Sequence, residues 1–207
     1  MIKYNIQADI IDIQTDNPKQ TDKFLIDTNV LYWLTYTRAS ISAKPPSPQQ
    51  GKDYPDYIKK ALAIKSGLLR TELHLTELGY LIETSELSIF NYSFPDIKRK
   101  EFRHNFTADY TKTVITELSA SWGQIKTITS TLEAKICELT GDAILARCKS
   151  QKADTCDLFT LEIMSKAGIN KIITDDGDFS TIPGIQVFTS NRNVISRAGT
   201  QKKLTRR

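Results

Sequence analysis

The stretch Phe24-Leu25-Ile26-Asp27-Thr28-Asn29-Val30-Leu31-Tyr32-Trp33-Leu34 rises through apolar residues to one acid, passes two small polar residues and becomes apolar again. This pattern predicts a short buried strand, a carboxylate at its C-terminal end and a helix that begins at once. Ligand sites in open α/β sheets lie beyond the carboxyl ends of the strands, so Asp27 is a candidate site acid. Aspartate is also a common helix cap, and this stretch alone leaves both interpretations open.

The composition is that of a globular protein. The chain has 207 residues, of which 40% are hydrophobic and 25% charged, enough for one large domain or one domain with an insertion. A net charge of +4 permits a nucleic-acid partner without indicating one. No apolar run approaches the ~18 residues that span a membrane. The three cysteines lack metal-ligand spacing, so we expect reduced thiols and a cytoplasmic protein.

The first half of the chain contains an N-terminal extension, the first strand and helix of the core, and an insertion. Alternating apolar residues from Ile2 to Ile10 predict a possible extra strand within an N-terminal extension, residues 1–22, and the parity change at Ile11 predicts a bulge or the strand's end. Prolines and glutamines in residues 40–55 predict a loop, a surface insertion rather than a lid. Residues 84–150 form a middle part that we expect to be mainly helical, including a helix over 125–139.

The last third is the most regular part. Residues 154–166 have helical spacing and end at Gly168 as a C-cap, 171–174 and 185–188 predict short buried strands, and an acidic turn lies between those strands. Together with the first strand and helix, these elements predict a three-layer α/β/α fold with a central parallel sheet. We expect the basic tail, residues 193–207, to be flexible.

Acids follow two of these strands, Asp27 after the first and the Asp175–Asp178 turn after a later one. If both strands belong to one parallel sheet, their carboxylates approach each other at its edge, with Asp175 facing solvent. Clustered carboxylates repel unless a cation joins them, and Mg²⁺ or Mn²⁺ prefers such oxygen ligands. A phosphodiester is a natural substrate, because a divalent ion activates water and offsets phosphate charge.

Four stretches together resemble the PIN-domain ribonucleases, the family that includes the toxins of VapBC toxin–antitoxin pairs and several RNA-processing nucleases. They are Ile26-Asp27-Thr28-Asn29-Val30-Leu31, Thr71-Glu72-Leu73-His74-Leu75-Thr76-Glu77-Leu78, Asp157-Leu158-Phe159-Thr160-Leu161-Glu162 and Thr174-Asp175-Asp176-Gly177-Asp178-Phe179. The resemblance covers residues 24–34, 70–83 and 153–188, within a PIN-like domain of residues 23–192.

The resemblance implies roles for eight residues. Four acids would hold the metal and support catalysis: Asp27, Glu77, Asp157 and Asp176. Asp178 would assist as a fifth acid through water. Thr174 would support the site by hydrogen bonding, and Asn29 would position the loop of the first acid. Asp154 lies one helical turn before Asp157 and is either a helix cap, a second-sphere acid or an alternative third ligand.

The function implied is a Mg²⁺/Mn²⁺-dependent endoribonuclease that leaves a 5′-phosphate and a 3′-hydroxyl. A toxin would bind an antitoxin and commonly form a homodimer, but this chain is longer than a compact toxin of the family. A basic tract with interleaved aromatics could follow an RNA backbone or be a solvated helix face: Lys98, Arg99, Lys100 and Arg103. The main alternative is a catalytically silent RNA-binding or scaffold protein on the same fold.

Overall fold

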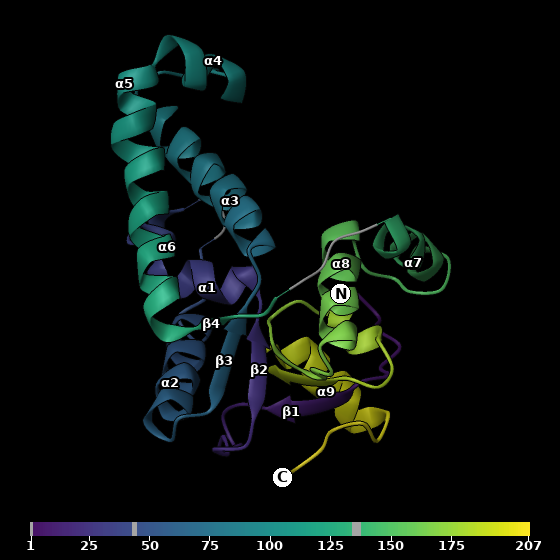
Figure 1. The fold of residues 1–207 in the computed structure, drawn as a ribbon. Helices are drawn as coiled ribbons and strands as arrows, with labels where there is room; N and C mark the ends of the chain where they lie inside the picture. Colours follow the sequence, from purple (N-terminus) through teal and green to yellow (C-terminus); the bar gives the residue numbers. More distant parts are fainter. Residues whose placement is uncertain (1, 43–44, 134–137) are drawn as a thin grey trace.

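The computed structural model describes residues 2–42, 45–133 and 138–207. Within these residues one sheet has six strands, all parallel, in the order β1-β6-β5-β2-β3-β4 (Figure 1). Its strands are β1 (Asp9–Asp12), β2 (Lys23–Ile26), β3 (Gly67–Arg70), β4 (Ser130–Thr131), β5 (Lys171–Ile173) and β6 (Gln186–Thr189). The predicted α/β class with a parallel sheet is therefore confirmed.

Helices pack against both faces of this sheet. The α-helices are α1 (Thr28–Thr35), α2 (Gln50–Ala63), α3 (Leu73–Phe90), α4 (Arg99–Asn105), α5 (Thr107–Tyr110), α6 (Thr116–Ile128), α7 (Glu138–Cys148), α8 (Thr155–Lys166) and α9 (Arg192–Thr200). A π-helical turn, Thr111–Ile115, joins α5 to α6, and short 3₁₀ turns lie at Ala39–Ile41 and Asp178–Thr181.

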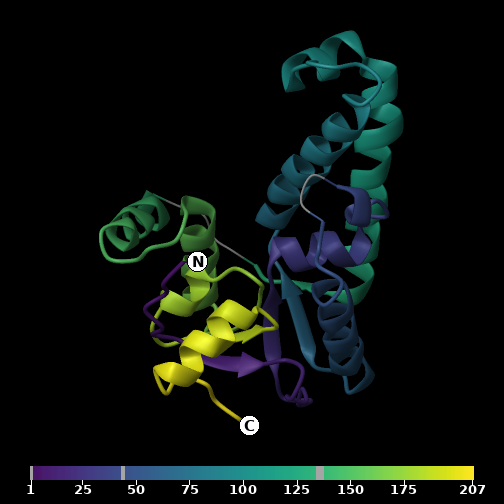
Figure 2. The same cartoon turned by 180° about the vertical axis from the view of Figure 1, so that it is seen from behind.

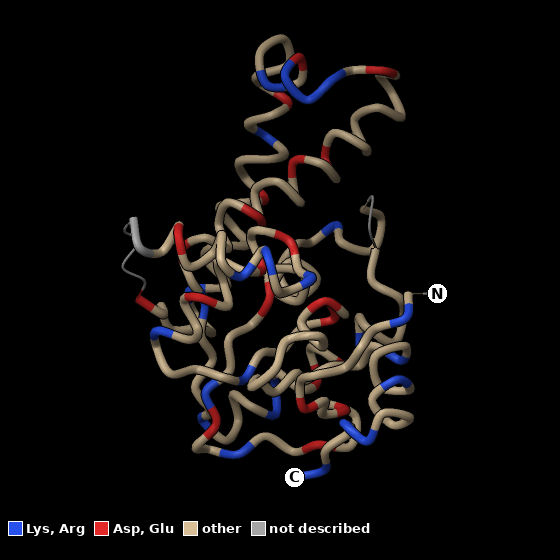
Figure 3. The backbone as a smooth tube through the Cα atoms, turned by 90° about the vertical axis from the view of Figure 1, so that its right-hand side faces the viewer, with Lys and Arg blue, Asp and Glu red and all other residues tan. Residues whose placement is uncertain are grey.

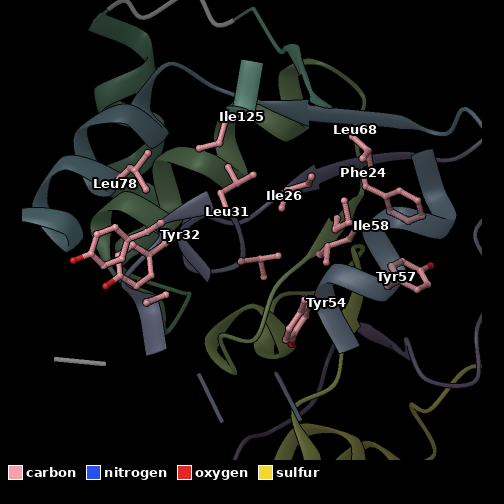
Figure 4. Close-up of a cluster of buried hydrophobic side chains, with 14 of the residues drawn as sticks. Phe24, Ile26, Leu31, Tyr32, Tyr54, Tyr57, Ile58, Leu68, Leu78 and Ile125 are labelled. Carbon is pink, nitrogen blue, oxygen red and sulfur yellow. The ribbon is translucent and has the colours of Figure 1, made fainter. Parts of the chain in front are cut away.

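Alternate residues of each central strand supply two separate hydrophobic cores. Phe24 and Ile26 of β2 pack in one core with side chains of α1, α2, α3 and α6 (Figure 4). Leu25, between them, packs in the other core with side chains of α7, α8 and α9. Since successive strand residues point to opposite faces, this division requires a sheet covered on both sides, which is compatible with three layers.

A helical arm leaves the sheet beyond the carboxyl ends of its strands. Helices α3 and α6 run side by side away from the sheet, and α4 and α5 lie at the far end of the pair (Figures 1 and 2). The far end is closed by aromatic packing: the ring centroids of Phe90 and Phe102 are 4.7 Å apart, and those of Phe90 and Phe106 are 5.0 Å apart. Charged residues of both signs lie there (Figure 3).

Three expectations about the first half and the middle of the chain are wrong. The extra strand exists but is Asp9–Asp12 rather than a strand ending near Ile10, because Ile10 and Ile11 are buried in opposite cores and no bulge is needed. Residues 50–55 begin helix α2 despite Pro55, because Tyr54, Tyr57, Ile58 and Ala61 are buried at helical spacing. The predicted helix 125–139 is interrupted: α6 ends at Ile128 and β4 pairs with β3, while residues 134–137 lie outside the described residues.

The prediction of a flexible tail is also wrong. Residues Arg192–Thr200 form α9, whose Val194 and Ala198 are buried. Beyond the helix, the backbone N–H of Thr205 donates to the carbonyl oxygen of Ile10 at 2.8 Å, and Arg207 forms ion pairs with Asp16 and Asp22. The charge of Arg207 thus has partners in the folded chain, so the basic composition of residues 193–207 wrongly suggested a flexible tail. No helix in the described part of the chain is long and apolar enough to cross a bilayer.

Candidate active site

Asp27 follows β2 directly and occupies the N-cap position of α1, but its side chain does not cap that helix. Instead one carboxylate oxygen, Oδ2, accepts a hydrogen bond from the hydroxyl of Thr174 at 2.7 Å. Asp27 is only 9% exposed. Burial first, and then the charges of Asp176 and Glu77, raise the pKa of Asp27 to about 7. The local structure therefore favours a site acid over a plain helix cap.

Thr174 connects Asp27 with the acidic turn that follows β5. Its hydroxyl oxygen accepts the backbone N–H of Asp176 at 2.8 Å while it donates to Asp27. The turn is then tightened by the backbone N–H of Asp178, which donates to Oδ1 of Asp176 at 2.8 Å. Since β2 and β5 are neighbouring parallel strands, their carboxyl ends bring Asp27 and Asp176 to the same edge of the sheet.

Glu77 reaches the same edge from the beginning of α3. The hydroxyl of Thr28, the first residue of α1, donates a hydrogen bond to Oε2 of Glu77. This contact joins two helix N-terminal regions whose residues are 49 positions apart. This contact gives Thr28 a supporting role that the sequence pattern did not indicate.

Asp157 completes the set from the first turn of α8. The side chain of Asp154 caps that helix by accepting the backbone N–H of Asp157 at 2.9 Å, which is the helix-cap alternative for Asp154. Burial, followed by the charges of Asp27, Asp154, Asp176 and Glu77, raises the pKa of Asp157 to about 9. All four acids of the predicted site are thus near enough to influence one another electrostatically.

The remaining acids of the turn have different surroundings. The pKa of Asp178 is raised, by burial and then by the charges of Asp176 and Asp154. Asp175 is not the solvent-facing residue that we expected, because it accepts hydrogen bonds from the hydroxyl of Tyr54 at 2.7 Å and the amide of Gln50 at 2.5 Å. Asp175 therefore ties the acidic turn to α2.

Two residues beside the acids were missed at the level of sequence. Tyr54 is buried, and its hydroxyl lies 3.1 Å from the carbonyl oxygen of Thr174 and 3.1 Å from the backbone nitrogen of Ser190, in addition to its contact with Asp175. Tyr4 lies against Gly177, where a Cβ would come within 2.3 Å of its ring, so a side chain at position 177 would require the Tyr4 ring to move. An aromatic residue far along the chain gives no local signal of such contacts.

The basic tract lies apart from this site, on α4 and the residue before it, at the far end of the arm (Figure 1). Arg103 pairs with the buried Glu83, its Nη2 lying 2.6 Å from Oε2, and Arg99 lies 3.4 Å from the same carboxylate. Lys98 and Lys100 are exposed. Two of the four cations that we proposed for RNA thus hold α4 against α3, and the tract does not adjoin the acids.

The donor set suits a hard divalent cation, since it consists of carboxylate oxygens in a partly buried place. Among residues 2–42, 45–133 and 138–207, no three Asp, Glu, His or Cys side chains form a group already placed to hold a metal ion. The acids thus influence one another electrostatically, but in the described residues they are not already placed as a ligand set. Asn29, two residues after Asp27, lines a neighbouring cavity.

Comparison with known proteins adds no family assignment. No protein-family model matches the chain, and no curated protein matches its sequence.

Proposed function

We propose that this chain is a PIN-like, Mg²⁺/Mn²⁺-dependent endoribonuclease. One observation carries the proposal: four acids spread over 150 positions, from Asp27 to Asp176, influence one another at a single edge of a parallel sheet. The pKa of Asp157 is raised by all three of the others after the effect of burial. Such concentrated negative charge is costly in a protein unless it serves to bind a cation.

Each residue of the candidate site has a defined role in this proposal. The ligands would be Asp27, Glu77, Asp157 and Asp176, with Asp178 assisting through water. Thr174 orients Asp27, Thr28 orients Glu77, and Asp154 fixes the first turn of α8 and thereby Asp157. A divalent ion would supply charge neutralisation for the phosphodiester and an activated water for its hydrolysis.

The substrate class follows from the same charges. Acidic side chains repel a phosphodiester directly, so binding of RNA at this edge requires a cation between them. The net charge of +4 is consistent with a polyanionic partner. We further propose that the protein acts in the cytoplasm, either as the toxin of a toxin–antitoxin pair, with an antitoxin and a second copy of itself as partners, or in RNA processing.

The test is cleavage of RNA by the purified full chain with Mn²⁺, with and without EDTA. We expect cleavage that EDTA abolishes, products with 5′-phosphate and 3′-hydroxyl ends, and a loss of at least ~100-fold in the Asp176→Asn variant, since the ion contributes several kcal/mol. The matched control is Asp9→Asn, which makes the same chemical change at an exposed position of β1 and should keep full activity.

A second measurement separates the catalytic proposal from a silent RNA-binding protein. Titration of Mn²⁺ into the wild type and Asp27→Asn should show binding that the substitution weakens. Wild-type protein that binds RNA but neither binds Mn²⁺ nor cleaves would contradict the nuclease proposal and support the binding protein.

A further inference from the structure

A cavity of about 330 Å³ lies next to the acids, between α1, α3 and the segment that leads into α2. It begins at Asn29, two residues after Asp27, and continues along α3 past Tyr80 to Thr84. Glu77 lies one helical turn before Tyr80 on the same helix, so the cavity and the acidic site share both α1 and α3.

Aromatic side chains supply much of the wall. Trp33 packs against Tyr54, with ring centroids 5.8 Å apart. The hydroxyl of the same tyrosine donates to Asp175. Tyr80 is 56% exposed, so part of its ring is open to a ligand. Tyr32 lies at the bottom, where its hydroxyl is satisfied by Ser85 at 2.7 Å.

Polar groups also line the cavity, and one arginine lies beside it without lining it. Thr84 accepts a hydrogen bond from Arg99 at 2.7 Å, and the guanidinium of Arg99 lies 4.2 Å from the centre of the Tyr80 ring. Asn29 and Gln50 are the amides on the opposite side, and Gln50 reaches Asp175 of the acidic turn. The lining therefore combines flat aromatic surfaces with hydrogen-bonding groups.

We propose that this cavity, which we call the base pocket (Asn29, Trp33, Gln50, Tyr80 and Thr84), holds a nucleobase of single-stranded RNA next to the phosphodiester at the acids. A base has an aromatic face for Tyr80 or Trp33 and polar edges for the amide of Asn29. The amide of Gln50 already has partners at both ends, since it donates to Asp175 and accepts the backbone N–H of Ser47. A purely apolar peptide side chain would leave the amide of Asn29 without a partner, which makes it a poorer occupant.

The inference rests on the proposed function, because it assigns a place to the strand that the acids would cleave. It adds a positioning role that the acids cannot perform, since carboxylates bind no particular base. Stacking of one base on an aromatic side chain contributes about 1–3 kcal/mol, which is roughly a 5- to 150-fold change in affinity.

The test measures binding of a fluorescent RNA oligonucleotide with Ca²⁺ in place of Mn²⁺, so that the carboxylates have a cation while hydrolysis is suppressed, together with a set in which one abasic position moves through the same sequence. For the wild type we expect one abasic position to weaken binding by at least ~5-fold. Tyr80→Ala should bind the intact oligonucleotide that much more weakly and lose the sensitivity to that position. Tyr80→Phe should restore both.

The matched control is Tyr92→Ala, which removes an 86% exposed tyrosine beyond the end of α3 and outside the base pocket. It should bind like the wild type. Equal binding by the wild type and Tyr80→Ala, or the same abasic sensitivity in both, would overturn the base pocket while the wild type's metal-dependent cleavage of RNA stands. A wild type that neither binds nor cleaves RNA removes both proposals.

Discussion

Thr174 shows how one hydroxyl can organise two acids. It donates to Asp27 and accepts the backbone N–H of Asp176, and both contacts lie in a buried place. Valine has nearly the same shape but can do neither. With valine at position 174, the carboxylate of Asp27 and the backbone N–H of Asp176 would each lack this partner, which costs about 1–3 kcal/mol per group.

We therefore predict that Thr174→Val lowers the rate of RNA cleavage by roughly 10- to 100-fold, the usual effect of removing a group that orients a ligand. Thr174→Ser retains the hydroxyl and should recover most of the activity. The measurement is the Mn²⁺ concentration dependence of cleavage for the three proteins. Full activity in Thr174→Val would show that the orientation of Asp27 does not limit the reaction.

At this scale the sequence predicted residue types better than contacts. Acids after strands and at helix starts could be identified because the end of a strand is where an α/β sheet places its sites. The contact of Thr28 with Glu77 and the burial of Asp175 against Tyr54 could not, because each joins residues far apart in the chain. Such contacts depend on packing, which has no local pattern.

Among the elements, α8 was predicted most closely and α2 least. Helix α8 has an aspartate cap and ends at Lys166, and Gly168, just after the C-cap residue Ala167, adopts φ +68°. The backbone N–H groups of Gly168 and Ile169 donate to Ser165 and Met164, as in a glycine-terminated helix. In α2, by contrast, Pro55 suggested a loop, and only the burial of one helical face stabilises the helix there.

Two glycines in different backbone conformations give opposite predictions for the same substitution, glycine to alanine. Gly168→Ala should destabilise the protein by about 1–2 kcal/mol, because alanine is strained at positive φ. Gly123→Ala, within α6, should stabilise it by about 0.5–1 kcal/mol, since a Cβ there meets no atom within 4 Å. Urea unfolding of both variants checks this, and a shift in the same direction for both would contradict it.

Across the whole molecule, an ion-pair network joins the two ends of the chain on the side opposite the acids. Arg207 contacts Asp16 at 2.7 Å and Asp22 at 2.9 Å, and Lys171 reaches Asp22 at 2.5 Å. Burial would raise the pKa of Asp22, but hydrogen bonds from Arg207 and Lys171 outweigh it and lower the pKa to about 2. The guanidinium of Arg207 also lies 4.5 Å from the centre of the Phe188 ring and donates a hydrogen bond to the hydroxyl of Tyr57 at 3.5 Å.

The sign of the pH dependence follows from that shift. A carboxylate whose folded pKa is lowered stabilises the fold above its ordinary value near 3.8, and this contribution disappears as pH falls towards 2. We predict that the stability difference between wild type and Asp22→Asn is full at pH 5 and narrows by pH 2. Acid-dependent urea unfolding, followed by circular dichroism, measures it, and a gap that stays constant with pH would contradict it.

The Arg207→Gln substitution tests the same ion-pair network by removing its cation. Loss of the guanidinium leaves two buried carboxylates with fewer counter-charges, and we expect a loss of roughly 3 kcal/mol at pH 7. Arg206→Gln, one residue earlier and exposed, is the matched control and should be within about 0.5 kcal/mol of the wild type. Equal stability of the two variants would show that the network contributes little.

Residues 203–205 also run alongside β1, the outermost strand on that side of the sheet. The carbonyl oxygen of Lys203 accepts the N–H of Ile10 at 2.9 Å, and the N–H of Thr205 returns a bond to Ile10. An open strand margin is a template on which a second molecule can add its own strand. Residues 203–205 therefore cover this edge and oppose self-association through β1. We expect a chain truncated before Lys203 to form larger oligomers as its concentration rises, even where the rest of its structure survives.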